Sequence, residues 1–504
     1  MLKRLRVILL QKSTFSNHYW FFTTFCLVIT IVYYLLFVNK GLVFLDEGYY
    51  VHISERILQG ERPYHDFNLI YTPGFFYLLA FVYKMFSPSI IAGRILTLAI
   101  CSGIVFIILS MLPKVTKPSL SIVFLSVLCL LSFGYPLINI PLVVWANVLV
   151  SLLALAMYLK LHAKKNYKSF YFSFFLGMFL ALGIFFKQNI GVVFVLLFNI
   201  LILARRDYAI KERLRTAFLI NAIVVLFTLL WLYPLLLTDN SKYLVTFIEF
   251  SQQFASQSAF SYPSLSLLLQ PFGIFKLLPY YLPIFFFIVL LFYAKTSKIN
   301  WNLFAFCLTP LIGFASTMYP QTDLLHIYPF FGPLLVAVLV FFQKERFPLV
   351  KGVVVVLIFT GFYLTIFTNS YRYEAPYREQ NTLLDLPRTK GIYVEKIKST
   401  DLSAVAQFLK THTKQSDYVF MYPDVPVLYF ILERRNPSKD VQYVVDTWHF
   451  HDDDMIISEI QEKKVKYLLK TDGLLQRGKL SRYIMNQKLV YVQGTYRIYQ
   501  NTTK

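Results

Sequence analysis

The sequence is poor in charged residues, and acidic residues are the scarcer kind. Only 15% of its 504 residues are charged, and 27 Asp and Glu stand against 49 Lys and Arg, which gives a net charge of +22. Hydrophobic residues make up 57% of the chain and aromatic residues 18%. Because soluble globular chains carry roughly a quarter charged residues, this composition excludes an ordinary soluble protein and indicates an integral membrane protein.

Cysteine is scarce as well. The chain contains four cysteines, and each falls inside a long apolar segment. A single buried cysteine behaves as a small apolar residue, so the sequence implies neither a disulfide framework nor a cysteine metal site. The four residues are Cys26, Cys101, Cys129 and Cys307.

Long apolar runs, by contrast, are abundant before residue 370. A helix needs about 20 apolar residues to cross about 30 Å of hydrocarbon, and about eleven segments meet or approach this length. The run 73–86 is shorter, and counting it as a crossing would reverse the sides of all later loops, so we interpret it as an interfacial helix. The predicted spans are 20–38, 90–111, 120–138, 143–161, 170–186, 190–204, 217–237, 278–294, 302–319, 327–343 and 350–368.

Basic residues are concentrated in alternate connections between these spans. They are frequent before the first span and in segments such as 160–168, 205–215 and 344–351, whereas the intervening connections contain few. The positive-inside rule then places the N-terminus in the cytoplasm, and an odd number of crossings places the C-terminus outside. No small-residue cleavage site follows the first span, which is therefore predicted to be an uncleaved anchor. We predict a multi-pass protein of the cell membrane, whose positive charge reflects topology and not nucleic-acid binding.

The composition changes near residue 370, which divides the chain into two predicted domains. Residues 1–369 form a transmembrane domain with a long outer loop at 39–89, and residues 370–504 are polar with the patterning of a soluble α/β domain. The predicted fold class is therefore an all-α polytopic membrane protein with a small extracytoplasmic α/β domain. The acidic run "HFHDDDM" at 449–455 is interpreted as a solvated loop and not as a metal site. Helices are expected at 401–413 and 425–437, and strands at 417–422, 464–470 and 489–501.

Ionisable residues gather just outside the first span. Asp46 and Glu47 stand there, followed by a helical pattern that ends at Gly60, and one interpretation makes Asp46 the N-cap of that helix. Capping does not explain why other predicted outer turns are also polar, and charges at membrane depth are costly and usually functional. We therefore predict a polar site at the outer membrane boundary. Its further candidates are Arg94, Asn147, Lys187, Gln188, Asn189, Asp323 and His326.

The stretch "LDEGYYVHISERILQGERPYHDFNLIYTPGFFYLL" resembles the first outer loop of the multi-spanning glycosyltransferases with the C-type (GT-C) fold. These enzymes use polyprenyl-phosphate sugars as donors, and they include protein O-mannosyltransferases, lipid A aminoarabinose transferases and, more distantly, the catalytic subunits of oligosaccharyltransferase. The shared pattern is a span that ends in Asp-Glu, an amphipathic helix that ends in Gly, a turn with Tyr and Asp, and an aromatic-Pro helix start. "AGRILTLAI", "GIFFKQNIG" and "QTDLLHIYP" are similar to later outer-face motifs of the family.

The resemblance implies an inverting transfer of a sugar from a polyprenyl phosphate to an acceptor hydroxyl at the outer face. It makes Asp46 the general base, with Glu47 orienting Asp46 or binding sugar hydroxyls. The leaving phosphate needs cations, and the candidates are Lys187 and Arg94, with His65 and His326 as secondary donors. Sugar and acceptor hydroxyls would be bound by Tyr64, Asp66, Gln188, Asn189 and Asp323.

Other interpretations of these residues stay open at the level of sequence. Lys187 can extend to the interface, Arg94 can pair with an acidic residue, and Asp323 can cap a helix. The family often has an acidic residue where this chain has Asn147, so no metal or other cofactor is indicated. The expected partners are the lipid-linked donor, the bilayer and a glycan, lipid or protein acceptor. The alternative class is a transporter or flippase of a lipid-linked sugar, for which internal repeats and mid-membrane sites are typical.

Overall fold

The computed structural model describes most of the chain. Two sequence predictions lie outside the described residues, namely the domain boundary at 369/370 and the position of Asp323. The acidic run 449–455 also falls mostly outside them. The described residues are 2–163, 170–237, 263–269, 273–296, 299–318, 324–343, 348–368, 375–423, 425–441, 453–472 and 478–502.

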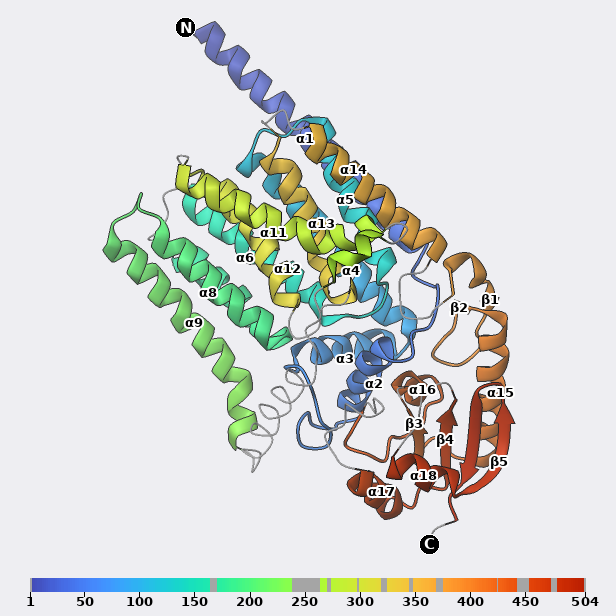
Figure 1. Cartoon of the computed structure of the whole chain (residues 1–504). Helices are drawn as coiled ribbons and strands as arrows, with labels where there is room; N and C mark the ends of the chain where they lie inside the picture. Colours follow the sequence, from blue (N-terminus) through green and yellow to red (C-terminus); the bar gives the residue numbers. More distant parts are fainter. Residues whose placement is uncertain are drawn as a thin grey trace.

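The larger part of the molecule is a bundle of apolar helices (Figure 1). Each predicted span coincides with an apolar helix, and among the described residues 6 helices are long and apolar enough to cross a membrane, by length and composition alone. The others are shorter, so the number of crossings rests on the sequence. The bundle helices are α1 (Leu2–Leu35), α4 (Ile90–Val115), α5 (Leu120–Ser132), α6 (Val143–Ala163), α7 (Phe170–Phe186), α8 (Gln188–Ala204), α9 (Ile210–Leu237), α11 (Gly273–Thr296), α12 (Trp301–Thr317), α13 (Leu324–Phe341) and α14 (Pro348–Tyr363).

Two short helices lie between the bundle and the C-terminal part of the chain (Figure 1). They are α2 (Asp46–Leu58) and α3 (Gly74–Phe86), both from the predicted outer loop. Helix α2 ends as predicted, because Gly60 follows it with φ +92°, a left-handed conformation that favours glycine. Helix α3 is the short apolar run 73–86 that was interpreted as interfacial, and it packs against α2 and α4.

The C-terminal part folds into a small α/β domain. Its main sheet has the strand order β3-β4-β6-β5, in which β3 (Val419–Tyr422) and β4 (Tyr467–Thr471) are parallel. The strands β5 (Lys488–Gln493) and β6 (Tyr496–Gln500) form an antiparallel hairpin at the other edge. A separate pair joins β1 (Thr382–Leu383) to β2 (Tyr393–Val394). The helices are α15 (Lys396–His412), α16 (Pro426–Ile431), α17 (Asp453–Glu462) and α18 (Lys479–Met485).

The sequence predicted the positions of the helices and strands of this domain better than it predicted their lengths. Predicted strands coincide with β3, β4 and the β5–β6 hairpin, and a predicted helix coincides with α15. The helix predicted over 425–437 is only the short α16, since the chain leaves the helix after Ile431 and Glu433 adopts φ +52°. The residues that follow contribute to an interface with the outer loop instead.

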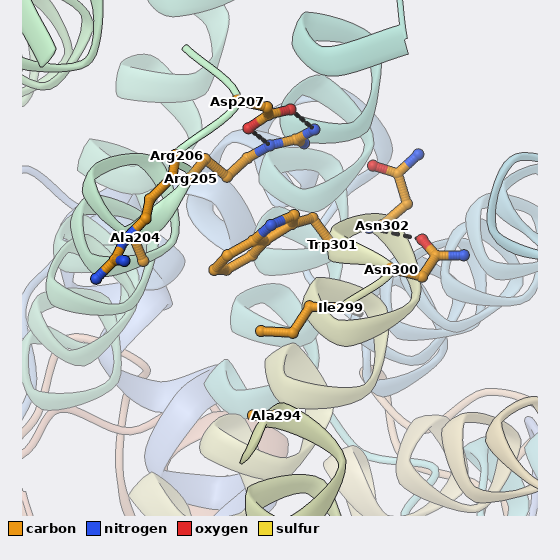
Figure 2. Close-up of a pocket in the computed structure, with 9 residues that line it drawn as sticks. All are labelled: Ala204, Arg205, Arg206, Asp207, Ala294, Ile299, Asn300, Trp301 and Asn302. Atoms are coloured by element: carbon orange, nitrogen blue, oxygen red, sulfur yellow. Dashed lines mark hydrogen bonds and ion pairs between the residues drawn. The ribbon is translucent and has the colours of Figure 1, made fainter. Parts of the chain in front are cut away.

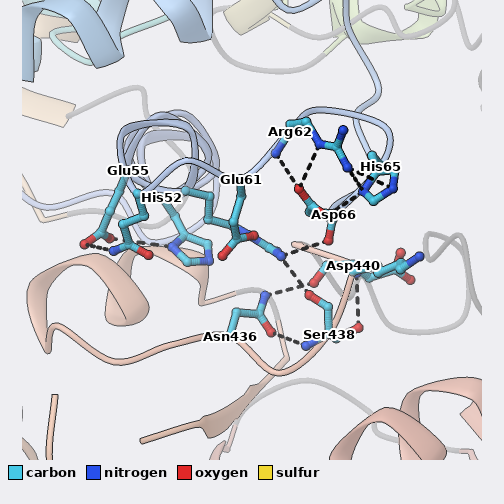
Figure 3. Close-up of polar contacts among 12 residues, drawn as sticks. His52, Glu55, Glu61, Arg62, His65, Asp66, Asn436, Ser438 and Asp440 are labelled. Atoms are coloured by element: carbon cyan, nitrogen blue, oxygen red, sulfur yellow. Dashed lines mark hydrogen bonds and ion pairs between the residues drawn. The ribbon is translucent and has the colours of Figure 1, made fainter. Parts of the chain in front are cut away.

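Helix α2 packs directly on α16 of the C-terminal domain. Gly48 allows this approach, because a Cβ at that position would lie 2.2 Å from the backbone nitrogen of Val427. Polar contacts extend the interface, with Arg56 Nη1 donating to the Ser438 carbonyl at 3.0 Å and Asn68 Nδ2 donating to Asp440 at 2.7 Å (Figure 3). The C-terminal domain is therefore seated on the outer loop that carries the Asp-Glu pair.

A buried histidine lies in this interface. The ring of His52 stacks on Tyr429 with centroids 4.8 Å apart and is 3% exposed. Burial lowers the pKa of His52 below its ordinary value, and Arg56 adds to this effect, whereas the Glu55 carboxylate, 3.8 Å from Nδ1, and the charge of Glu61 raise it. The neutral ring is thus the form that the folded interface prefers.

This preference predicts that acidification weakens the interface. An unfolded histidine binds its proton near about pH 6.5, so the stabilising effect of a neutral His52 is complete above that pH. It is lost as the pH falls toward the lower folded-state pKa, at up to about 1.4 kcal/mol per pH unit. The melting temperature of the full-length protein, measured from pH 8 to pH 5.5, should fall less in His52→Phe than in the wild type. His412→Gln, at an exposed position on α15, is the control, and an unchanged acid response in His52→Phe would contradict the prediction.

Candidate functional site

The acidic pair opens helix α2. Asp46 is the first helical residue and Leu45 occupies the N-cap position, so Asp46 is not the N-cap residue. A carboxylate in the first turn is favoured there by the partial positive charge of the helix N-terminus. Asp46 is partly exposed, whereas Glu47 is fully buried. The two neighbours therefore have different environments and are suited to different roles.

Glu47 and Arg94 form a fully buried ion pair. Arg94 Nε donates to one carboxylate oxygen at 2.7 Å and Nη2 donates to the other at 2.8 Å, and both side chains are 0% exposed. The remaining guanidinium N–H groups bind the turn after α1, with Nη1 on the carbonyls of Val38 and Lys40 and Nη2 on that of Gly41. A guanidinium has five N–H donors, and all five are used.

This ion pair assigns both residues a positioning role. The occupied donors of Arg94 leave none for a donor phosphate, which favours its predicted pairing with an acidic residue over the phosphate-binding interpretation. Glu47 also accepts the N–H of Val43 at 3.1 Å. The pair thus links the end of α1, the start of α2 and helix α4, and it holds the backbone from which Asp46 projects.

The turn between α7 and α8 brings Lys187 to the loop before α3. Gly191 permits the close approach of the two helices, because a Cβ there would lie 2.2 Å from the backbone nitrogen of Ile184. Lys187 is 7% exposed, and its Nζ lies 4.9 Å from the centre of the Tyr71 ring. A buried ammonium beside an aromatic face is stabilised by a cation–π interaction. Lys187 is therefore held inside the protein and does not simply extend to the interface.

Gln188 fastens the same loop to the bundle. Its Oε1 accepts the N–H of Thr72 at 3.2 Å, and its Nε2 donates to the carbonyl of Ile70 at 3.4 Å. The hydroxyl of Thr72 donates to the carbonyl of Ile184 at 2.8 Å. Gln188 thus uses both ends of its amide on the loop backbone, which supports a positioning role beside the predicted sugar contact.

Aromatic residues lie between the region around Asp46 and the region around Lys187. Burial raises the pKa of Tyr50 well above its ordinary value, and the nearby Tyr71 and Asp46 raise it further. The Tyr50 ring stacks on that of Phe76, with ring centroids 5.5 Å apart. Tyr50 stays protonated as a result, and it lies in the electrostatic range of both Asp46 and the ring that contacts Lys187.

Two buried amide oxygens nearby have no hydrogen-bond partner among the described residues, those of Asn147 and Asn189. Asn147 is 0% exposed on α6, and its Oδ1 would lie 3.7 Å from a Cβ placed on Gly183 of α7. A buried polar atom without a partner is costly and marks a place where water or a ligand group is accommodated. The sequence marked Asn147 only as a polar residue near an outer turn, and its position within the helix junction is a result of packing.

The predicted contacts around residue 65 form a separate group. Asp66 accepts the N–H of Arg62 at 2.7 Å and pairs with His65 at 2.6 Å, while Arg62 contacts both nitrogens of the His65 ring (Figure 3). Burial raises the pKa of the Asp66 carboxyl, but these hydrogen bonds and charges outweigh it, so the net pKa lies below its ordinary value. This turn follows the C-terminal end of α2, at the opposite end of the helix from Asp46.

Arg56 ties this turn to the C-terminal domain. It pairs with Glu61 at 2.6 Å and donates to the carbonyls of Asp66 and Ser438 at 3.1 and 3.0 Å. Tyr64 lies in the same turn with φ +64°, and its hydroxyl donates to the Tyr71 carbonyl at 2.8 Å. Tyr64 is thus the member of this group that reaches toward Lys187.

The remaining candidates do not join either group on the described contacts. His326 lies in the first turn of α13 and is partly exposed. Among the described residues, no three His, Cys, Asp or Glu side chains are close enough to hold a metal ion. The four cysteines are buried and unpaired in apolar helices.

A helical bundle, a first outer loop with an acidic helix start, and a small α/β domain seated on that loop together define a class of fold. It is the fold of the GT-C glycosyltransferases. No family model and no curated protein matches the sequence.

The lipid A aminoarabinose transferase ArnT from Cupriavidus metallidurans, bound to undecaprenyl phosphate, superposes with a TM-score of 0.58. The identity is 13%, and the match covers 95% of this chain and 98% of ArnT. The apo state of the same protein gives a TM-score of 0.54 over 95% and 97% of the two chains. The archaeal oligosaccharyltransferase AglB from Archaeoglobus fulgidus, in complex with an inhibitory peptide and a dolichol-phosphate, gives 0.49 at 11% identity over 89% and 69%. The match to ArnT confirms the predicted fold.

Proposed function

We propose that this chain is a membrane glycosyltransferase that moves a sugar from a polyprenyl phosphate to an acceptor hydroxyl at the outer face of the cell membrane. The observation that carries the proposal is the end-to-end match of fold with ArnT, which was solved with undecaprenyl phosphate bound. In support of this proposal, the acidic start of α2 belongs to the segment 39–89, and the buried Lys187 contacts Tyr71 of the same segment. In this proposal the N-terminus is cytoplasmic and the domain 370–504 is extracytoplasmic.

Asp46 acts as the general base in the proposed reaction. The acceptor oxygen forms a bond to the anomeric carbon while its proton passes to the Asp46 carboxylate, and the bond from that carbon to the phosphate oxygen breaks. The bonding electrons leave with the phosphate. Attack from the side opposite the leaving group inverts the anomeric centre. The buried Glu47–Arg94 pair supports this role, since it orients the first turn of α2 without competing for substrate.

Lys187 stabilises the leaving phosphate. A cation that is already desolvated interacts more strongly with developing negative charge than one in water does. Asn147 and Asn189 offer buried acceptor oxygens to the hydroxyl groups of the sugar. The acceptor is a glycan, lipid or protein that enters from the side of the C-terminal domain.

The proposal is tested by following the donor lipid. Purified full-length protein in vesicles, given a polyprenyl-phosphate sugar and a panel of acceptors, should release polyprenyl phosphate together with a glycosylated acceptor. Movement of the intact lipid-linked sugar across the bilayer, without release of polyprenyl phosphate, would establish a transporter and overturn the proposal.

Replacing Lys187 by Met should lower kcat/KM for the donor by about 10²–10³-fold, the usual effect of removing one group that stabilises developing negative charge. Methionine keeps the apolar stem against Tyr71 and removes only the charge. Lys84→Met is the matched control, because Lys84 is exposed on α3 of the same outer loop. Equal rates of polyprenyl phosphate release in Lys187→Met and the wild type would exclude Lys187 from the phosphate site while leaving the overall reaction intact.

A further inference from the structure

A polar cavity lies at the end of α8 that is remote from Lys187. Its volume is about 830 Å³, and its walls come from the connection between α8 and α9, the end of α11 and the start of α12 (Figure 2). Helix α8 has 17 residues, so this cavity is about 25 Å along the helix from Lys187. It is distinct from the candidate glycosyl-transfer site and lies on the side predicted to be cytoplasmic.

Arg205 and Asp207 form a preorganised wall of the cavity. Asp207 accepts from Nε and Nη2 of Arg205 at 3.0 and 2.7 Å, and the guanidinium lies 5.5 Å over the Tyr208 ring. Hydrogen bonding to Arg205 lowers the pKa of Asp207, so the pair stays ionised. Arg205 is 8% exposed, and its Nη1 has no hydrogen-bond partner among the described residues. The buried guanidinium therefore has donor capacity left for another acceptor.

Arg206 carries a positive charge that no carboxylate among the described residues neutralises. It lines the cavity, is exposed, and forms no ion pair or hydrogen bond with the described residues. Arg205, Arg206 and Asp207 together leave one positive charge at the cavity. Because a cavity with fixed walls holds this charge at the membrane boundary, it attracts an anion more specifically than an open basic loop does.

The opposite wall presents neutral donors. Asn300 caps α12 by accepting the N–H groups of Asn302 and Leu303 at 3.2 and 3.3 Å, which leaves its amide NH₂ as a donor. The Asn300 N–H donates to the Tyr293 hydroxyl at 3.0 Å, which fixes this connection. In the view of Figure 2 the Trp301 indole stands between Arg206 and the two asparagines. Amide and indole N–H groups beside a guanidinium are suited to phosphate oxygens.

Exposed apolar side chains lie close in sequence to residues that line the cavity. They are Leu203, Ile210 and Phe292 on α8, α9 and α11, which are 37%, 56% and 63% exposed. Exposed large apolar residues on membrane helices contact acyl chains, and tryptophan is enriched at the lipid–water boundary. We propose that this cavity binds a phosphate ester group through Arg206 and the neighbouring amide and indole donors. Its source is either an anionic lipid headgroup or a soluble phosphate compound.

The test uses the full-length protein in detergent with three probes: dioctanoyl phosphatidylglycerol, dioctanoyl phosphatidylcholine and inorganic phosphate. Native mass spectrometry measures the bound molecules. Phosphatidylglycerol should be retained over phosphatidylcholine, and Arg206→Gln should weaken it about five-fold, since one basic residue near a lipid surface contributes about 1 kcal/mol. Lys211→Gln, exposed on α9 and outside the cavity wall, should leave retention unchanged.

A second measurement places the ligand in the cavity. Brominated phosphatidylglycerol should quench part of the tryptophan fluorescence, and Trp301→Phe should remove that part. Displacement of the lipid by millimolar inorganic phosphate would identify a soluble phosphate ligand, and no displacement would identify the lipid headgroup. Equal losses in Arg206→Gln and Lys211→Gln, or equal retention of both lipids, would overturn the proposal.

Discussion

Replacing Asp46 by Asn is expected to lower kcat for polyprenyl phosphate release by about 10²–10⁴-fold, the usual contribution of a positioned general base. Asparagine has nearly the same size and keeps an acceptor oxygen, but it cannot take the acceptor proton. The KM for the donor should change little, because the phosphate and the lipid tail are held by other parts of the site. Initial rates at saturating donor, measured with purified protein of equal folded fraction, provide the comparison.

Two further variants test whether the loss of activity is specific to the Asp46 carboxylate. Asp46→Glu keeps the base but moves it by one methylene, so its rate should lie between those of the wild type and Asp46→Asn. Asp385→Asn removes an exposed carboxylate of the C-terminal domain and should have no effect. Turnover in Asp46→Asn at the wild-type rate would exclude Asp46 as the base and require another residue for proton transfer.

The second large effect concerns the Glu47–Arg94 pair. Removing one member of a buried ion pair costs about 3–5 kcal/mol, because the other charge is left unpaired in the protein interior. Arg94→Met and Glu47→Met should each strongly lower the melting temperature of the full-length protein in detergent. The double variant should be less destabilised than the sum of the two, since it contains no unpaired charge.

The control for the Glu47 and Arg94 single and double variants is an exposed ion pair on the C-terminal domain. Lys479 contacts Asp454, with side chains 62% and 66% exposed, and exposed pairs contribute little. Lys479→Met should therefore leave the melting temperature almost unchanged. Glu47→Gln keeps one acceptor oxygen for the Arg94 guanidinium, and the folded fraction of this variant should show a lower kcat with a similar donor KM, as expected if Glu47 positions Asp46. Additive losses in the Glu47/Arg94 cycle would show that the two residues stabilise the protein independently.

The helical architecture and the end of α2 could be predicted because they depend on local patterns. Apolar runs long enough for the membrane coincide with bundle helices, and Gly60 follows α2 in the left-handed conformation that few other residues adopt. The strands of the C-terminal domain follow from alternation and β-branched composition in the same way. A helix was predicted at 425–437, but its early end at Ile431 was not, because nothing in the local pattern indicates the left-handed conformation of Glu433.

The Asp-Glu motif did not indicate that its two residues have different environments. Asp46 and Glu47 are adjacent in sequence, and only the fold places one at the partly exposed helix start and the other in a fully buried ion pair. Arg94 was a candidate for phosphate binding for the same reason, because an unpaired basic residue at a helix start looks identical in sequence whether it faces a ligand or a carboxylate.

The sequence by itself determined that the chain is a membrane protein, which segments are apolar enough to form its helices, and where its polar outer loop lies. The hydrophobicity of a segment and the spacing of its apolar residues can be read from neighbouring positions, without knowledge of the fold. Tertiary structure alone decided the partners: Glu47 meets Arg94 across 47 residues and Thr72 meets Gln188 across 116. Such contacts depend on which helix faces pack together, and this packing depends on the side chains of the whole core.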